Sequence, residues 1–337
     1  MRLDDFDYEL PADRIAQTPV EPRDAARLLV DRGSQPCAHR HVRDLVEILQ
    51  PGDLLVVNET KVIPARLALR RETGGKAEVL MLEPLDAERK VWEALVRPAR
   101  KLRVGELLYS PAGAPVVEIG ERTAAGDTSR VSIVGSLDSL DVLATHGEMP
   151  LPPYITERLA DPDRYQTVYA NQPGSAAAPT AGLHFTAELL AALAERGVEQ
   201  AEVELVVGLD TFRPIGEADP LRHRMHTERY RVPADTLARC RAARRVVAVG
   251  TTSVRALESA AATGSLGGRT DIFIHHGFEW RVVDVLMTNF HLPRTTLLMM
   301  IDGFVGARWR TLYDEALREG YRFLSFGDAM LLDRHAG

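Results

Sequence analysis

One stretch of the sequence predicts the fold more plainly than any other: Arg245-Val246-Val247-Ala248-Val249-Gly250-Thr251-Thr252-Ser253-Val254-Arg255. Its first half is an almost continuous apolar run, which is typical of a buried strand, and Gly250 provides a tight turn before a helix begins. The first N–H groups of a helix have no partner within it. Together with the neighbouring Thr and Ser hydroxyls they form a candidate site for a carboxylate or phosphate. Simple capping of the helix by Thr or Ser is the alternative interpretation.

The same succession of strand and helix continues on both sides of this stretch. Helices are predicted at 187–196, 234–244, 252–262, 296–304 and 309–319, and strands at 53–57, 201–207, 245–250, 272–274, 282–286 and 321–326. Thr186 is expected to cap the first of these helices and Gly197 to end it. Such alternation is characteristic of a layered α/β domain.

A different pattern occupies residues 70–136. Short apolar runs alternate with glycine-rich turns there, at 77–82, 91–96, 106–109, 116–119 and 131–134. Short strands at near-regular spacing predict a small β-barrel or sandwich. With 337 residues the chain is too long for one ordinary core. We therefore expect a layered α/β core domain formed by residues 1–69 and 150–337, with an inserted small all-β barrel domain at 70–149.

A polar loop lies between an expected strand and an expected helix: Thr288-Asn289-Phe290-His291-Leu292-Pro293-Arg294-Thr295. Open α/β sheets place their ligands at the carboxyl ends of strands. His291 could transfer a proton there and Asn289 could orient a ligand. The alternative is a structural loop in which Thr295 caps the next helix.

A second polar loop follows a run of small residues: Pro179-Thr180-Ala181-Gly182-Leu183-His184-Phe185. Small residues such as Gly182 permit a close approach of the backbone to a ligand. His184 is a further candidate for proton transfer, although a lone histidine is more often a hydrogen-bonded structural residue.

Composition sets broad limits on the function. The formal net charge of −7 argues weakly against nucleic acid as a partner, although Lys and Arg gather at 89–103 and again at 222–231. Most such basic runs are solvated faces. Two cysteines are too few for a disulfide framework, no apolar stretch is long enough to span a bilayer, and the acidic N-terminus lacks a signal peptide. We expect a cytoplasmic protein with no membrane partner.

The spacing of His223 and His226 could present two metal ligands on one side of a helix. The sequence has no His-Glu-x-x-His motif and no cysteine ligand pair, so no metal is expected. It also has no Walker loop, no dinucleotide fingerprint and no Gly-x-Ser-x-Gly elbow. Phosphoryl transfer, nicotinamide chemistry and serine hydrolysis are disfavoured by these absences.

Taken in order, the loops and several further segments resemble one family, the S-adenosylmethionine:tRNA ribosyltransferase-isomerases of queuosine biosynthesis. The resemblance runs nearly end to end and is specific because so many ordered segments agree. These segments are 5–11, 51–67, 151–155, 165–170, 177–185, 249–255, 288–293 and 326–330.

The resemblance implies an α/β core with an inserted β-barrel and an unusual reaction. The ribosyl moiety of S-adenosylmethionine, a cosubstrate, would pass to the aminomethyl-deazaguanine base (preQ1) of a tRNA, giving epoxyqueuosine with release of adenine and methionine. The positive sulfur acidifies the neighbouring C5′–H, so a base, a proton donor for departing adenine and a dry site are required. The proton-transfer candidates are His184, His226 and His291. Candidates for substrate binding are Asn58, Lys61, Arg66, Thr180, Gly182, Thr251, Thr252, Ser253, Arg255 and Asn289. A monomer is expected.

Four positions depart from the family pattern: Glu59, Val206, Asp210 and His276. Glu59 and Asp210 add negative charge that would repel a nearby phosphate. A second interpretation is therefore a paralogue that transfers from S-adenosylmethionine to a small-molecule acceptor. A zinc-dependent hydrolase using the His223 and His226 pair and a catalytically idle RNA-binding relative are further alternatives.

Overall fold

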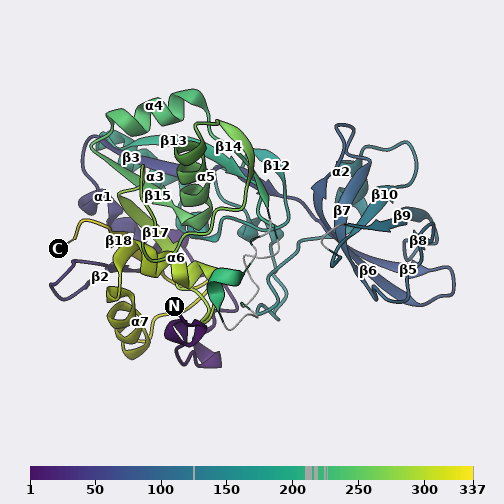
Figure 1. Ribbon diagram of the computed structural model, residues 1–337, viewed down its shortest axis with the longest axis horizontal. Coiled ribbons are helices and arrows are strands. Elements are labelled where there is room, and N and C mark those ends of the chain that lie inside the picture. The colour runs from purple at the N-terminus through teal and green to yellow at the C-terminus, as the bar shows by residue number, and fades with distance from the viewer. Residues whose placement is uncertain (124–125, 209–214, 216–218, 224, 226, 337) are drawn as a thin grey trace. The chain divides into compact units, whose positions relative to one another are not determined.

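The computed structural model describes residues 1–123, 126–208, 215, 219–223, 225 and 227–336. The chain divides into two compact units (Figure 1). Unit 1 contains Met1–Thr60, Pro153–Gln172 and Pro179–Gly337, and unit 2 contains Lys61–Pro152 and Pro173–Ala178. No helix in the described ranges is both long and apolar enough to cross a membrane.

Unit 1 is built on a nine-stranded mixed sheet in the order β16-β14-β13-β3-β15-β17-β18-β1-β2. Its centre is β3 (Asp53–Asn58), in which all six residues are buried. β3 runs parallel to β13 (Glu199–Leu205) and β15 (Arg245–Val249), and β15 runs parallel to β17 (Val285–Asn289). The remaining strands are β1 (Arg27–Val30), β2 (Ala38–His41), β14 (Glu228–Arg231), β16 (Gly267–Thr270) and β18 (Ala329–Asp333), and β18 is antiparallel to β17.

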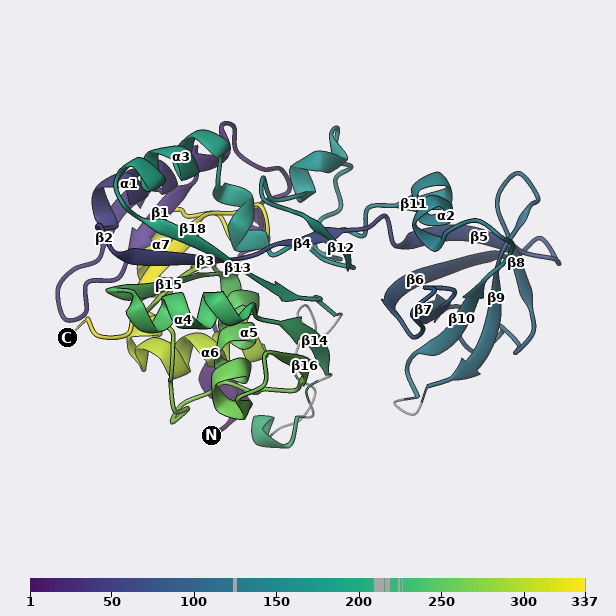
Figure 2. The same ribbon diagram turned by 90° about the horizontal axis from the view of Figure 1, so that it is seen from above.

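Helices cover both faces of this sheet. On one face, α1 (Leu45–Ile48) and α3 (Ala187–Glu195) pack on a core that includes Val57, Val249 and Met287. Figure 2 shows these two helices on one side of β3 and β15, with α4, α5 and α6 on the other. The other helices are α4 (Ala234–Ala242), α5 (Gly250–Thr263), α6 (Thr296–Val305) and α7 (Arg308–Arg318). Short 3-10 turns are η1 (Leu3–Phe6), η2 (Ala12–Arg14), η3 (Arg23–Ala25), η4 (Val42–Asp44), η5 (Pro162–Tyr165), η6 (Thr180–His184) and η8 (Pro220–Arg222).

A buried carboxylate joins α5 to the segment that leads into β17. Glu258 is fully buried, and its two oxygens accept backbone N–H groups of Arg281 (2.9 Å), Val282 (3.0 Å) and Val283 (3.0 Å). Burial raises the pKa of this carboxyl group, while the three N–H donors act in the opposite direction. Glu258 thereby fixes where β17 begins relative to α5.

Unit 2 contains a six-stranded antiparallel barrel. The order is β5-β6-β7-β10-β9-β8, and pairing of Arg70 with Tyr109 closes the ring between β5 and β8. Closure leaves no free edges on these six strands. The strands are β5 (Arg66–Arg71), β6 (Lys76–Pro84), β7 (Val91–Arg97), β8 (Leu107–Tyr109), β9 (Pro115–Arg122) and β10 (Ser129–Ile133), with α2 (Ser139–His146) and the short β11 (Gly147–Glu148) beside them. β4 (Thr60–Val62) and β12 (Gln172–Ser175) form a separate two-stranded sheet.

The predicted fold class, a layered α/β core with an inserted small β-barrel, is confirmed. The barrel's first strand, β5, begins at Arg66, ahead of residue 70. Thr186 caps α3 by accepting the N–H of Leu189 (3.1 Å), and Thr295 accepts the N–H of Leu298 (3.4 Å) at the start of α6. The Thr186 cap agrees with the prediction, and the Thr295 cap is the one that the structural alternative for the 288–295 loop required.

Two predicted strands are wrong. At 272–274 the N–H of Ile272 donates to Thr270 Oγ1 (3.1 Å), which turns the chain away from the sheet directly after β16. At 321–326 the apolar side chains are buried, but Leu324 has a φ of 68°, which a strand cannot accommodate. The last strand of the sheet is instead β18.

Asp53 provides a test of what holds the central strand in place. Its side chain is fully buried and accepts bonds from Arg244 Nη1 (2.8 Å), Arg245 Nη2 (2.6 Å) and the N–H of Gln50 (3.0 Å). Burial alone would raise the pKa of Asp53, but these donors outweigh it and lower the pKa. We predict that Asp53→Asn lowers the free energy of unfolding at pH 7 by about 2 kcal/mol, because two partly exposed arginines lose a buried partner.

Urea unfolding monitored by circular dichroism measures this effect. The matched control is Glu279→Gln, which removes an exposed carboxylate paired with Arg281 (2.7 Å) and should change stability by less than about 0.5 kcal/mol. Equal effects of the two substitutions would contradict the prediction.

Candidate active site

The helix that follows β15 begins without a side-chain cap. Gly250 has a φ of 83°, and the N-cap residue Val249 makes no side-chain bond to the first turn of α5. Ser253 Oγ donates to the carbonyl of Val249 (2.8 Å), so this hydroxyl is bonded to the helix itself. The alternative interpretation, in which a Thr or Ser side chain caps this helix, is therefore wrong. In the part of the chain that the structure describes, no N-cap side chain bonds to the first N–H groups of α5, as the binding of another partner there requires.

Two polar side chains in the first turns of α5 are buried without full hydrogen bonding. Thr252 is 6% exposed and Arg255 5% exposed. Within the described part of the chain, Thr252 Oγ1 and the Nε and Nη2 atoms of Arg255 have no hydrogen-bond partner. An unpaired buried polar group costs about 1–3 kcal/mol, and such groups point to a ligand that the residues are built to hold.

A buried carboxylate holds the third guanidinium nitrogen. Arg255 Nη1 pairs with Glu228 Oε2, and Glu228 Oε1 accepts the N–H of Gly208 (2.7 Å). Glu228 is 5% exposed, so the pair is shielded from water. One nitrogen of Arg255 is thus fixed by β14, and the remaining two can face an anion.

An amide connects the two polar loops that the sequence placed as candidates. Asn289 Oδ1 accepts the hydroxyl of Thr180 (3.0 Å), and Asn289 Nδ2 lies 3.0 Å from His184 Nε2. The same nitrogen donates to the carbonyl of Asp328 (3.4 Å). Because the amide nitrogen can only donate, His184 Nε2 accepts and the imidazole proton resides on Nδ1. The structure therefore brings Thr180, His184 and Asn289 together.

His184 is held in its neutral form. It is 4% exposed, and burial lowers the pKa of His184 to about 3, with further lowering by the charges of Arg322, Arg164 and Arg23. A neutral imidazole with its proton on Nδ1 acts as a hydrogen-bond donor at that nitrogen.

The glycine of the same loop is required by packing. A Cβ on Gly182 would lie 2.0 Å from the hydroxyl of Tyr169 and 2.8 Å from Thr167 Cγ2. The close neighbours of Gly182 are thus two side chains of the protein. Tyr169 Oη is itself buried without a partner among the described residues.

His291 belongs to a different set of contacts. Its Nε2 lies 3.0 Å from Thr288 Oγ1, its N–H donates to Tyr313 Oη (2.9 Å), and its carbonyl accepts the hydroxyl of Tyr8. Burial lowers the pKa of His291 to about 3. Thr288 and Asn289 are successive residues of β17, so they point to opposite faces of the sheet. His184 and His291 are consequently fastened to opposite faces at the same strand end.

The candidates from the N-terminal segment have other surroundings. Asn58 is fully buried, donates to the carbonyl of Leu205 (3.0 Å) and accepts its N–H (3.1 Å), so it joins β3 to β13. Its role in substrate binding stays a prediction. Lys61 is exposed on β4, and Arg66 lies 3.6 Å from Glu78 on the barrel. Both belong to unit 2, whereas His184 belongs to unit 1.

Three of the four departures from the family pattern lie among the described residues. Glu59 pairs with Arg231 (3.3 Å) and accepts from Asn171 Nδ2 (3.2 Å), so its charge is balanced internally. Val206 is buried, and His276 is an exposed residue 3.6 Å from Asp302. Asp210 lies outside the described residues.

The metal hypothesis cannot be placed on the pair that suggested it, because His226 lies outside the described residues. Among the residues that are described, one group could hold a metal, with the ligand atoms of Cys37, His39 and Glu315 within 4.8 Å of one another. Glu315 is already bound by Arg318 (2.6 Å) and by His39 (3.2 Å).

Sequence reasoning missed several residues of these networks. Glu228 carries no motif of its own, and nothing local indicates that it binds Arg255, 27 residues later. Asp328 lies in a segment of the family resemblance, 326–330, and its side chain accepts the N–H groups of Arg27 (2.9 Å) and Arg322 (2.8 Å). An aspartate directly after a Phe-Gly turn was the available signal.

Comparisons with known proteins show which family the chain resembles. A family model described as queuosine biosynthesis protein matches residues 3–332. A protein of Symbiobacterium thermophilum named S-adenosylmethionine:tRNA ribosyltransferase-isomerase is 52% identical over 98% of this chain and 100% of its own length. A protein of the same name from Rubrobacter xylanophilus is 51% identical, with 98% of each chain covered.

A solved structure is similar as well. The crystal structure of the S-adenosylmethionine tRNA ribosyltransferase of Thermotoga maritima shares 38% identity, covers 97% of this chain and 99% of its own, and superposes with a TM-score of 0.54. With a family model spanning nearly all of its length and relatives at half identity, the chain belongs to the queuosine biosynthesis protein family.

Proposed function

We propose that this protein is an S-adenosylmethionine:tRNA ribosyltransferase-isomerase. It transfers and isomerises the ribosyl moiety of S-adenosylmethionine onto the aminomethyl-deazaguanine base of tRNA, giving epoxyqueuosine and releasing adenine and methionine. The observation that carries the proposal is the match to relatives of this name along 98% of the chain, with both polar loops included. S-adenosylmethionine is a cosubstrate, and the enzyme works in the cytoplasm as a monomer without a metal. Nothing in the comparisons favours the small-molecule paralogue or the zinc hydrolase.

The methionine carboxylate of S-adenosylmethionine is the ligand that suits the start of α5. A helix N-terminus favours negative charge, and a guanidinium with two unpaired nitrogens favours a carboxylate. Arg255 and Thr252 offer unused polar atoms there, and Thr251 and Ser253 belong to the same turn. Burial of this site excludes water, which strengthens each of these interactions.

The histidines divide into two roles in this proposal. Asn289 keeps the proton of His184 on Nδ1, so His184 can donate a hydrogen bond to a group that gains electron density, as adenine does when it departs. Abstraction of the C5′ proton then falls to His291 or to His226. Thr180 acts through Asn289 and is a positioning residue.

Measurement of adenine tests the proposed activity directly. The protein is incubated with S-adenosylmethionine, with and without tRNA carrying the aminomethyl base. Adenine released only in the presence of that tRNA is the expected result. Release without tRNA would indicate another acceptor, and no release under either condition would refute the proposal.

The proton-transfer assignment predicts a large kinetic effect. Alanine at the base should lower kcat by about 100-fold or more while the far-ultraviolet circular dichroism is unchanged. The measurement is single-turnover adenine release by the His184→Ala, His226→Ala and His291→Ala variants. If all three retain wild-type rates, the assignment is wrong.

The tautomer of His184 gives a sharper prediction. Asn289→Asp keeps the shape of the side chain but replaces the donor that faces His184 Nε2 with an acceptor, so the ring proton moves to Nε2. We expect kcat to fall by about 100-fold while the Kd for S-adenosylmethionine, measured by calorimetry, changes less than about 3-fold. Gln35→Glu, an exposed amide-to-acid change, is the matched control. A higher Kd for S-adenosylmethionine with an unchanged kcat would contradict the assigned role.

Thr252 separates ligand binding from stability. Thr252→Val removes a buried hydroxyl that has no partner among the described residues, so the free energy of unfolding should stay unchanged or rise. The Kd for S-adenosylmethionine should increase about 5-fold, corresponding to one lost hydrogen bond. Thr263→Val is the control, because its hydroxyl lies at the other end of α5 and donates to Ser259 (2.8 Å). Unchanged affinity in Thr252→Val would remove this residue from the site.

A further inference from the structure

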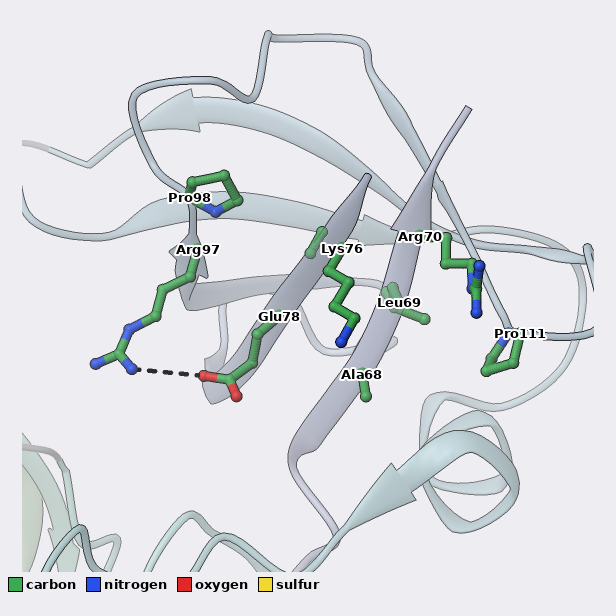
Figure 3. A pocket seen from close by; sticks show the side chains of 9 residues that line it. Ala68, Leu69, Arg70, Lys76, Glu78, Arg97, Pro98 and Pro111 are labelled. Carbon is green, nitrogen blue, oxygen red and sulfur yellow. Dashed lines mark ion pairs between the residues drawn. The ribbon is translucent and has the colours of Figure 1, made fainter. Parts of the chain in front are cut away.

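The outer face of the barrel carries a group of basic side chains around a hollow. Residues alternate between the inside and outside of each strand, and Arg66 and Arg70 of β5, Lys76 of β6 and Arg97 of β7 are all at least partly exposed. The hollow beside them has a volume of about 730 Å³, and its lining includes Arg70, Lys76, Glu78, Arg97, Pro98 and Pro111. Figure 3 shows these side chains at the hollow. We call the surface formed by Arg66, Arg70, Lys76 and Arg97 the basic face.

A single carboxylate lies among the four cations. Glu78 is 3.6 Å from Arg66. It is also 3.9 Å from Arg97, an ion pair drawn in Figure 3. The side chain of Arg97 is 77% exposed. Both distances are long for ion pairs, and exposed pairs of this kind contribute little. One negative charge shared between two arginines leaves the basic face with a surplus of positive charge.

Two of the cations oppose each other within the sheet. Arg70 of β5 and Lys76 of β6 are directly paired in the antiparallel register, and both are exposed. Like charges in this position destabilise a sheet. No acidic side chain among the described residues pairs with either of them. The barrel therefore retains two neighbouring positive charges that repel each other and that its fold does not require. Such a pair is expected where a bound anion supplies the negative charge that the protein itself lacks.

We propose that the basic face binds the phosphate backbone of the tRNA substrate; this inference rests on the proposed function. The chain as a whole carries a formal charge of −7, so attraction of a polyanion requires a local concentration of cations. A flexible or helical RNA strand presents successive phosphates, and several cations on one face release its counterions together. The hollow offers room for the backbone, and the methylene stems of Arg70 and Lys76 with Pro98 and Pro111 form its apolar walls.

The test uses the full-length protein and neutralises the opposed pair. Arg70→Gln, Lys76→Gln and the double variant are compared with wild type in anisotropy titrations of labelled tRNA between about 50 and 200 mM salt. For the double variant we expect a Kd about 10-fold higher and a salt slope smaller by about 2, one unit for each lost phosphate contact. The KM for tRNA should rise in parallel, while kcat at saturating tRNA and the Kd for S-adenosylmethionine stay within twofold.

Arg130→Gln is the matched control, because Arg130 is an exposed arginine on β10 of the same barrel, away from the hollow. The proposal is overturned if the double variant binds tRNA as Arg130→Gln does, or if kcat falls with KM unchanged. It is also overturned if a polyglutamate peptide binds wild type as tightly as tRNA and loses affinity equally in the double variant, since the face would then dock acidic protein. If the wild-type protein releases adenine with tRNA and the variants bind tRNA as tightly as wild type, only the role of the basic face is refuted. If the wild-type protein releases no adenine, the proposed function is refuted.

Discussion

The central strands of unit 1 are buried on both faces, and this constraint decides where polar chemistry can occur. All residues of β3 and β17 are buried, and four of the five in β15 are. A polar group within such a strand must be fully hydrogen-bonded, so side chains with unused bonding capacity are confined to the strand ends. Asp53 lies at the start of β3, and Asn289 at the end of β17. The candidate site follows from this arrangement because two of its three loops leave the carboxyl ends of β15 and β17, and the third, η6, bonds to the last residue of β17.

Local signals made much of the fold predictable. The apolar run before Gly250, the cap Thr186 and the alternating strands of the barrel depend on neighbouring residues, and the structure has them where they were expected. The errors arose where tertiary packing overrides the pattern. The apolar residues at 321–326 resemble a strand, yet Tyr321 and Phe323 pack on Phe290 (centroids 5.6 and 4.7 Å), and their segment turns at Leu324. β5 was missed although its residues alternate, with Leu67 and Leu69 buried and Ala68 and Arg70 exposed.

The residues of the candidate site could be predicted from the sequence, but the hydrogen bonds and ion pairs between them could not. His184, Asn289 and Thr180 carry the polar groups of two recognisable loops, so sequence reasoning could name them. That His184 bonds to Asn289, 105 residues away, follows only from the packing of η6 against β17. The same holds for Arg255 and Glu228. The separation of His184 from His291 could not be predicted for a simpler reason. Their partners Asn289 and Thr288 are adjacent in sequence, yet adjacent residues of a strand face opposite sides of the sheet.

The short turn η6 has a consequence for how the site opens. Thr180 and His184 stand at the two ends of this five-residue turn, and both bond to the same amide of Asn289. A displacement of the turn large enough to break one bond carries the other partner with it, so both are lost in one step. Because one amide holds both ends of the turn, any movement that releases the turn also removes the group that keeps the imidazole proton of His184 on Nδ1.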